Sequence, residues 1–211
     1  MTAPDRLTQT ASRAGAQETG QETRHEVAEY ALLGLLREGP RHGYRLAAEF
    51  TASGRLGVAL RLKMGQMYAY LHKLERQGLL VAHDESGAAA RRTRRVFALT
   101  ADGERTFDAW LAAPVEATRE VRLAFLLKLA FTLDNPQAAL ALLDRQRAAT
   151  AAWLERLRAR DAQAGGSRGP QGPAHGALGR LALRHRILLT EAALAWLDET
   201  RAEVAAKSGR E

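Results

Sequence analysis

The sequence predicts a mainly α-helical fold with one β-hairpin, divided into an N-terminal domain that contains the hairpin and a C-terminal domain of antiparallel helices. Up to residue 113, apolar residues recur mostly at helical spacing, and two short strand-like runs interrupt them before residue 100. Beyond residue 114 there is no strand pattern, and long helical periods rich in Ala and Leu remain. A chain of 211 residues has room for two such small domains.

The chain begins with a polar segment, residues 1–24, in which basic and acidic side chains balance. Such a segment buries too little apolar area to offset its ordering entropy, so we expect a disordered tail. The domain proper should run over residues 25–113. Its first helix, residues 26–37, has a broad apolar face and should end at Gly39-Pro40. A second helix is expected from His42 to about Thr51, burying Tyr44, Leu46, Ala47 and Phe50.

The domain is organised around the stretch from Lys63 to Leu80, KMGQMYAYLHKLERQGLL. Met67, Leu71 and Leu74 recur at helical spacing and form one apolar stripe, and Gly78 supplies the signal for a helix end. The opposite face should expose Gln66, Ala69, Tyr70, Lys73 and Gln77. This stretch is therefore predicted to be a partly exposed helix with a defined end.

A hairpin with an arginine-rich connection follows this helix. Residues 79–83 and 96–99 are predicted to be paired strands, and the basic residues before the second strand are Arg91, Arg92, Arg94 and Arg95. These cations repel one another unless a polyanion lies nearby, so we expect a wing that lies along a DNA groove or backbone. A solvated charge run is the alternative. The order of helix, stop, strand, basic loop and strand predicts a winged helix-turn-helix.

Polar and basic side chains of the helix complete the expected DNA-binding set. Cations that neutralise phosphates release counterions, and polar groups that reach base edges add selectivity. We expect DNA contacts from Lys63, Gln66, Tyr68, Tyr70, Lys73, Arg91, Arg92, Arg94 and Arg95. A solvated helix face is the alternative, and Tyr68 fits the core equally well.

The net charge of +7 and the pI of about 10.3 fit a polyanion partner. The balanced charge of residues 1–24 argues against an arm that enters a DNA groove.

Separated motifs of this domain resemble those of the PadR family of bacterial transcriptional regulators. The family's Leu-Leu…Gly-Pro-x-His-Gly-Tyr-x-Leu is matched by Leu35, Leu36, Gly39, Pro40, His42, Gly43, Tyr44 and Leu46. Its Gly-(Thr/Ser)-Leu-Tyr-Pro-x-Leu-x-x-Leu-Glu-x-x-Gly-Leu is matched from Gly65 to Leu79, with Gln66 replacing the hydroxyl residue and Ala69 the proline. The wing exit is similar too, at Phe97, Leu99, Thr100 and Gly103.

The resemblance implies a DNA-binding repressor that binds a palindromic operator as a homodimer, through a C-terminal helical dimerisation domain. It also implies release by a small hydrophobic or aromatic effector. The three tryptophans are candidates for lining an effector pocket, although ordinary core positions are the better interpretation: Trp110, Trp153 and Trp196.

Residues 114–207 are predicted to form the dimerisation domain. Residues 121–133 are apolar almost all round, with Lys128 expected to extend outward. A long helix should begin at Asn135-Pro136 and end near residue 162, before a mobile Gly/Pro-rich loop at 165–176 and a final helix to about Lys207. Wide apolar faces favour pairing within and between chains, with a monomeric bundle as the alternative. The dimerisation residues are predicted to be Leu126, Leu129, Leu178, Leu181, Leu188, Ala192 and Trp196.

Other functional classes have little support in the sequence. Cys is absent, and no motif for nucleotide binding, nucleophilic catalysis or metal coordination occurs, so we expect no enzyme, cofactor or metal. His42 is expected to cap or pack rather than to bind a metal or switch with pH. No signal core and no long apolar run is present, so we expect a cytoplasmic protein without membrane association. Two rival functions stay open: a winged helix that docks on an acidic protein, and a DNA-binding dimer that senses no ligand.

Overall fold

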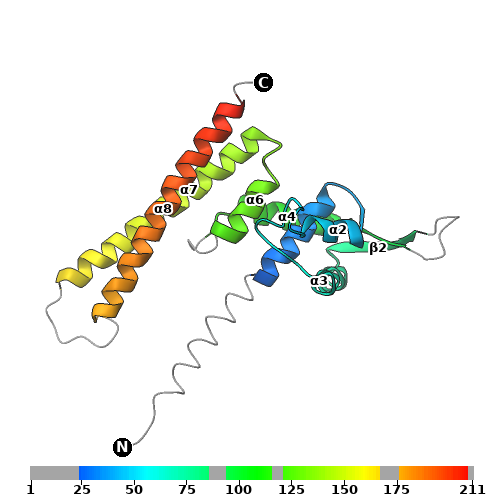
Figure 1. Ribbon diagram of the computed structural model, residues 1–211, viewed down its shortest axis with the longest axis horizontal. Coiled ribbons are helices and arrows are strands. Elements are labelled where there is room, and N and C mark those ends of the chain that lie inside the picture. Colours follow the sequence, from blue (N-terminus) through cyan, green and yellow to red (C-terminus); the bar gives the residue numbers. More distant parts are fainter. Residues whose placement is uncertain (1–23, 86–93, 116–120, 167–175, 209–211) are drawn as a thin grey trace, which may run out of the picture. The chain divides into compact units, whose positions relative to one another are not determined.

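A computed structural model describes residues 24–85, 94–115, 121–166 and 176–208. This part of the chain is mostly helical and contains a three-stranded antiparallel sheet (Figure 1). The chain divides into two compact units, Met1–Trp110 and Leu111–Glu211, called here the N-terminal and C-terminal units. The predicted tail and most of the predicted loop at 165–176 lie outside the described residues.

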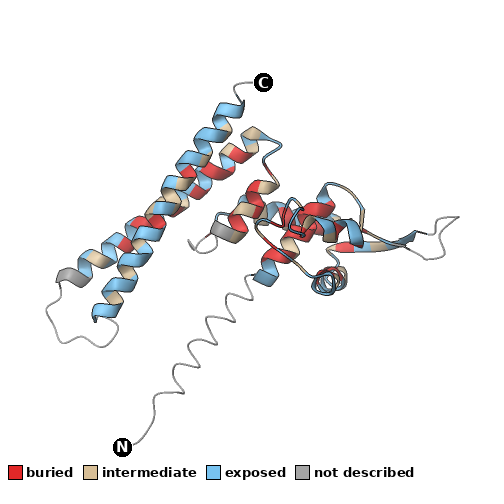
Figure 2. Cartoon of the chain, viewed as in Figure 1, coloured by how far each residue is buried: buried red, intermediate tan, exposed pale blue. Residues whose placement is uncertain are grey.

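Within its described residues, the N-terminal unit contains four helical segments. Residues 24–37 are helical, as the apolar pattern predicted. They are followed by α2 (Gly43–Glu49), α3 (Met64–Arg76) and α4 (Ala101–Ala112). The largest share of the buried side chains comes from the first segment and from α3 (Figure 2), namely Val27, Leu32, Leu33, Leu35, Leu36, Met67, Leu71 and Leu74.

The helix at α2 differs from its prediction in its bounds and in its buried residues. It begins at Gly43 because His42 is the last residue of a short strand, and the predicted burial of Tyr44 is wrong. The ring of Tyr44 is 52% exposed and stacks on the His42 ring, with centroids 5.6 Å apart and an interplanar angle of 13°. The helix ends at Glu49, before the predicted Thr51, and it buries only Gly43 and Leu46. The predicted burial of Ala47 is also wrong, because this side chain is half-buried.

Three antiparallel strands form the sheet in the order β1-β3-β2. They are β1 (Arg41–His42), β2 (Leu80–Glu85) and β3 (Arg94–Leu99). The register pairs Leu80 with Leu99 and Glu85 with Arg94, which confirms the predicted hairpin. Phe97 of the central strand is fully buried and anchors the sheet to the core.

Two local contacts join the end of α3 to the start of α4. Gly78 has a φ of +71°, a left-handed conformation that favours glycine, and it ends α3 as predicted. Thr100 caps α4 by accepting a hydrogen bond at its Oγ1 from the Gly103 N–H, at 3.0 Å. The same hydroxyl donates to the Gly78 carbonyl at 2.8 Å. The residue that caps α4 thus also gives a hydrogen-bond donor to a carbonyl just after α3.

The described residues of the C-terminal unit form helices joined by turns, and they contain no strand. The apolar stretch predicted at 121–133 is split into a π-helical turn, η1 (Val121–Phe125), and a short helix, α6 (Leu126–Ala130). The long helices α7 (Pro136–Gly166) and α8 (Ala177–Ser208) lie side by side and antiparallel (Figure 1). The Asn135 cap is confirmed, because its Oδ1 accepts the Ala138 N–H at 3.1 Å.

Ion pairs connect α7 to α8 along their length. Arg147 contacts Asp198 at 2.5 Å, Arg158 contacts Glu191 at 2.9 Å, and Arg201 contacts Asp144 at 2.6 Å. The hydrogen bond from Arg201 lowers the pKa of the Asp144 carboxyl below its ordinary value. These pairs are solvent-exposed, so each stabilises the helix pair only modestly, and the buried apolar side chains between the helices contribute more.

Buried polar side chains hold the start of the C-terminal unit in place. Gln146 is fully buried and accepts the Val115 N–H at 2.8 Å while donating to the Val115 carbonyl at 3.1 Å. Lys128 is also buried and donates to the Ala113 carbonyl, so the expectation that it extends into solvent is wrong. Both side chains find backbone partners, which offsets the desolvation of their polar groups.

Candidate nucleic-acid interface

Helix α3 is seated on the core by one face and on α2 by an aromatic contact. Met67, Leu71 and Leu74 are buried, as their spacing predicted. The hydroxyl of Tyr68 lies directly over Gly43, in a place that a Cβ atom at position 43 would occupy. The Tyr68 ring also meets the ring of Phe97 edge-on, with centroids 6.4 Å apart. Tyr68 therefore positions α3, and a side chain at residue 43 would have to displace the Tyr68 ring.

Tyr70 lies on a different face from the one that was predicted. Its side chain is buried and its ring packs edge-on against His25, with centroids 5.6 Å apart. Burial raises the pKa of the Tyr70 hydroxyl, and the nearby Glu29 carboxylate raises it further. The expected exposure of Tyr70 is wrong because the helix at residues 24–37 covers this flank of α3.

The exposed face of α3 begins at its first residue. Gln66 accepts the backbone N–H of Lys63 at its Oε1, at 3.2 Å, which satisfies one free donor at the start of the helix. Lys63 precedes the helix and is itself exposed. The residues of α3 that face solvent are Met64, Gly65, Gln66, Ala69, His72, Lys73 and Arg76.

Two expected DNA-binding cations are held by carboxylates on opposite flanks of α3. Lys73 contacts Glu29 of the first helix at 2.6 Å, and the Glu29 side chain is only 12% exposed. Arg95 of β3 contacts Glu75 at 2.7 Å and lies 5.7 Å from the centre of the Phe97 ring. In the free chain, both cations are therefore partly neutralised by acids 44 and 20 residues away in sequence.

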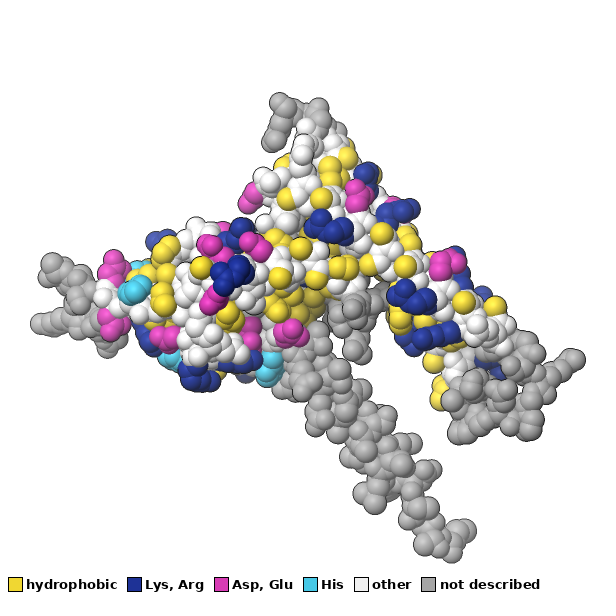
Figure 3. All heavy atoms as spheres, turned by 180° about the vertical axis from the view of Figure 1, so that it is seen from behind, with side chains coloured by type: hydrophobic (Ala, Val, Ile, Leu, Met, Phe, Trp, Pro, Cys, Tyr) yellow, Lys and Arg dark blue, Asp and Glu magenta, His cyan; other side chains and the backbone are white. Residues whose placement is uncertain are grey.

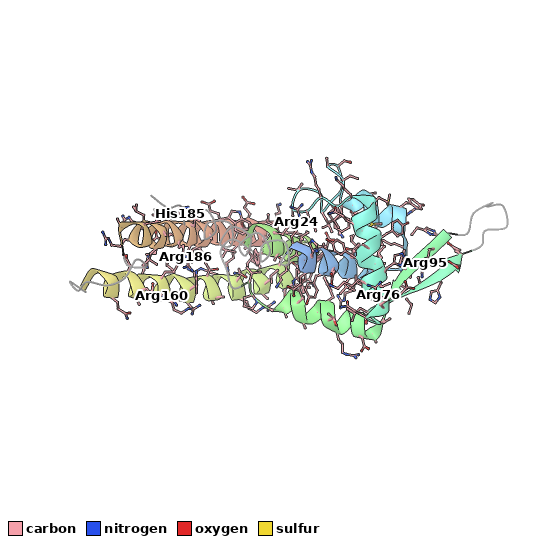
Figure 4. The ribbon with its side chains drawn as sticks, turned by 90° about the horizontal axis from the view of Figure 1, so that it is seen from below. Arg24, Arg76, Arg95, Arg160, His185 and Arg186 are labelled. Atoms are coloured by element: carbon pink, nitrogen blue, oxygen red, sulfur yellow. The ribbon has the colours of Figure 1, made fainter. Side chains whose placement is uncertain are left out.

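The basic wing is only partly within the described residues. Arg91 and Arg92 lie outside them, and Arg94 is the first residue of β3, opposite Glu85. Figure 4 shows Arg95 on β3 and Arg76 at the end of α3. Arg76 was missing from the predicted DNA contacts, although helical spacing places it on the same exposed face as Ala69 and Lys73.

His42 packs against Tyr44 and lies beside Glu85, which agrees with the packing role expected for this residue. Its Nε2 lies 3.3 Å from a carboxylate oxygen of Glu85, and its ring stacks on Tyr44. Its side chain makes no cap for α2. Among the described residues, no group of three or more His, Asp or Glu side chains is arranged to hold a metal ion. No helix in the described ranges is both long and apolar enough to cross a membrane.

The predicted dimerisation residues divide by location. On α8, Leu178, Leu181 and Leu188 are 79, 65 and 54% exposed. Leu129 of α6 is buried within the single chain, and Leu126 is half-buried. Figure 3 shows apolar and basic side chains interspersed along the α7–α8 pair. Ala192 is exposed, and Trp196 is half-buried against Phe125, with ring centroids 6.0 Å apart.

Each of the three tryptophans has aromatic or cationic neighbours in its own unit. Trp110 stacks on Tyr30, with centroids 4.9 Å apart and nearly parallel rings. Trp153 has two guanidinium groups over its ring, those of Arg156 and Arg186, at 5.2 and 5.4 Å from the ring centre. These contacts show which side chains surround each ring. The role of the three tryptophans in an effector pocket stays a prediction.

The model of the transcriptional regulator PadR-like family matches residues 32–109, which include α2, α3, the sheet and most of α4. Residues 32–109 therefore form a domain of the PadR-like family. A second model, virulence activator alpha C-term, matches residues 121–205. PadR family regulators bind DNA as transcriptional regulators, so the matched domain indicates a DNA-binding transcriptional regulator. Among curated proteins, none matches the sequence.

Solved structures of PadR proteins are similar to this chain. Bacillus subtilis PadR in complex with operator DNA is 25% identical, covers 83% of this chain and 98% of its own, and has a TM-score of 0.40. The same protein in complex with p-coumaric acid is 25% identical over 86% of this chain and 97% of its own, with a TM-score of 0.37. A PadR-like transcriptional regulator from Bacillus cereus is 19% identical over 85% and 99%, with a TM-score of 0.35.

Proposed function

We propose that the chain is a homodimeric PadR-type repressor that binds a palindromic operator and is released by a small hydrophobic or aromatic effector. One observation carries the proposal: α3 presents an exposed face, bordered by basic residues, beside a wing whose sequence is rich in arginine. A helix followed by a wing is the arrangement that places one element in the major groove and the other along the backbone or minor groove.

The DNA-binding residues fall into positioning and reading groups. Lys63, Arg76 and the wing arginines are the phosphate-contacting cations of this proposal, because guanidinium and ammonium groups that meet phosphates supply affinity without sequence information. Gln66 and Lys73 lie on the exposed face of α3 and can reach base edges. Tyr68 and Tyr70 support the helix from the inside, so their contribution is to its position.

A second copy of the chain is the partner proposed for the exposed leucines of α8. Leu178, Leu181, Leu188 and Leu189 are all about half exposed or more, and apolar patches of this kind mark interaction sites. A two-fold dimer would carry two recognition helices, which fit half-sites separated by one turn of DNA and hence a palindrome. Leu129 is buried in the single chain, so the proposed contact relies on α8 rather than on α6.

Release by an effector is the part of the proposal that rests on the family resemblance. Aromatic rings that line a site suit a flat apolar ligand, and tryptophans are present in both units. Thermal-shift screening against small aromatic acids, followed by titration of the protein–DNA complex, tests this part. A dimer that binds DNA and responds to no compound in either assay would favour the rival in which no ligand is sensed.

Gel-shift titration over a salt series tests DNA recognition. The duplex is the region upstream of the chain's own gene, with random duplex as competitor, and selection from genomic fragments follows if that region fails. Specific retention that weakens steeply with salt, and collapses when the four wing arginines become Ala, supports the proposal. Retention no better than random for every fragment, together with capture by an acidic protein, would favour the protein-binding winged helix.

Sedimentation analysis tests the dimer. Leu181→Arg with Leu188→Arg places two cations on the exposed face of α8 and should convert the dimer to monomer. Leu133→Arg is the matched control, because Leu133 is a similarly exposed leucine outside α8. A doubly substituted chain that keeps the mass of a dimer would contradict the use of this face.

A further inference from the structure

The exposed face of α3 carries no charge over its N-terminal half. From Met64 to Leu71 the helix contains no Lys, Arg, Asp or Glu. Further along, Lys73 is bound to Glu29, and His72 lies within 3.5 Å of both Glu75 and Arg95. Recognition helices of this architecture contact base edges mainly with their N-terminal residues. The part of α3 best placed to read bases therefore consists of apolar and amide side chains.

Two of these side chains are apolar and face water. Met64, the first residue of α3, is 50% exposed, and Ala69 is exposed about one and a half turns later. In the major groove, the 5-methyl group of thymine is the one apolar group that the four base pairs offer. An exposed apolar side chain at the reading end of the helix thus has a specific partner in DNA, which is the thymine methyl.

Gln66 has its carbonyl end occupied by the helix. Its Oε1 accepts the Lys63 N–H, so its amide NH2 is the end that is left for DNA. Bidentate recognition of adenine by glutamine uses both ends of the amide, one to accept and one to donate. Because one lone pair of Oε1 is engaged by the helix, the NH2 is the end that Gln66 offers most directly, and it selects an acceptor such as guanine O6 or N7, or thymine O4.

We infer that Met64, Gln66 and Ala69 determine operator specificity by reading thymine methyl groups and one hydrogen-bond acceptor in the major groove. This inference rests on the proposed function, since it requires α3 to enter that groove. Gln66 and Ala69 also stand where the resembled family motif has a small hydroxyl residue and a proline. The base preference should accordingly follow from this chain's own residues.

Deoxyuridine substitution tests the methyl contacts. Preferred duplexes are first selected from a random-sequence library with the full-length chain, and each thymine is then replaced in turn by deoxyuridine, which lacks only the 5-methyl group. At the contacted thymine, affinity should fall about fourfold per half-site, which corresponds to the roughly 0.8 kcal/mol of one buried methylene-sized group. In Met64→Ala or Ala69→Ser, replacing the thymine that the altered side chain contacts by deoxyuridine should no longer change the affinity.

Gln66→Glu tests the amide contact. Glutamate keeps an oxygen to accept the Lys63 N–H, so the helix start is preserved, but it has no NH2 to donate. Selected duplex should lose at least tenfold in affinity relative to random duplex. Gln77→Glu is the matched control, because it makes the same charge change at an exposed position at the far end of α3 and should weaken both duplexes alike.

The outcomes separate this inference from the proposed function. A selection that yields no preferred sequence contradicts both. A clear preference in which every thymine tolerates deoxyuridine, or in which the deoxyuridine effects are the same in Met64→Ala, Ala69→Ser and the natural chain, overturns the methyl reading alone. Equal loss in Gln66→Glu and Gln77→Glu overturns the role of the Gln66 amide.

Discussion

Replacing Glu29 by Gln should strengthen binding to DNA of any sequence. In the free chain the Lys73 ammonium lies 2.6 Å from the Glu29 carboxylate, whose side chain is 12% exposed, whereas that of Lys73 is 47% exposed. In the proposed complex, DNA therefore competes with the Glu29 carboxylate for this lysine. Glu29→Gln removes the charge, keeps the shape, and leaves an amide oxygen that can still accept a hydrogen bond from Lys73.

The size of the effect follows from two arguments. An ion pair that is partly exposed contributes up to about 1 kcal/mol, so freeing Lys73 should raise the affinity for random duplex roughly two- to fivefold. Each cation that neutralises a phosphate contributes about 0.9 to the slope of log K against log salt concentration. In the natural chain, Lys73 either stays paired with Glu29 and releases no counterion from DNA, or it moves to a phosphate and leaves the Glu29 carboxylate to bind a cation from solution. In both cases the net release of cations is smaller. The variant avoids both, so its slope should be steeper by up to about 0.9 per chain.

Fluorescence anisotropy with a random duplex over a salt series measures both quantities. Glu203→Gln is the matched control, since it raises the net charge equally at an exposed position of α8 and should leave the slope unchanged. Glu29→Gln combined with Lys73→Gln should return the slope to its natural value. A slope that stays unchanged in Glu29→Gln, or an affinity that falls, would refute the idea that Glu29 competes with DNA and would indicate that it orients Lys73 toward the duplex.

Three further substitutions test the packing and the ion pairs. Gly43→Ala forces a Cβ into the Tyr68 hydroxyl and should cost about 1–3 kcal/mol in urea unfolding; unchanged unfolding would show that the ring moves freely. Gln146→Leu leaves the N–H and C=O of Val115 without partners and should cost about 2–4 kcal/mol by the same measurement; unchanged unfolding would contradict the role of these two hydrogen bonds. Asp144 has a lowered pKa, so its pairing stabilises the fold above its ordinary value of 3.8 and is lost as pH falls below it; Asp144→Asn should flatten that acid loss in thermal melts.

The sequence predicted the elements well wherever a local signal was strong. The apolar stripe of Met67, Leu71 and Leu74, the stop at Gly78 and the cap at Thr100 all appear in the structure as expected. Each depends on residues within a few positions of one another, through helical spacing, a left-handed glycine or a side chain that caps its own helix. Helix faces, helix ends and helix caps of this kind can be predicted from the sequence without knowledge of the tertiary fold.

The errors concern side chains whose surroundings come from distant parts of the chain. Tyr70 was assigned to the exposed face of α3 on periodicity, but His25, which packs against it, lies 45 positions earlier in sequence. Lys128 was expected in solvent, but the Ala113 carbonyl gives its ammonium a buried acceptor. Tyr44 was placed in the core as an aromatic residue, although a short helix leaves it outside. Helical period alone cannot show which other element covers a flank.

Which cations are free to bind DNA also depends on tertiary contacts that the sequence does not show. A pI of about 10.3 suggests many cations free to meet DNA, yet Lys73 and Arg95 are each bound to an acid beside the recognition helix. Those carboxylates leave the helix flanks nearly neutral and its N-terminal half free of charge. Affinity must then come mostly from cations outside the reading surface, such as Arg76 and the wing arginines, while selectivity falls to uncharged side chains. A regulator built this way can change its operator by exchanging uncharged residues of α3, without altering the charges that bind the DNA backbone.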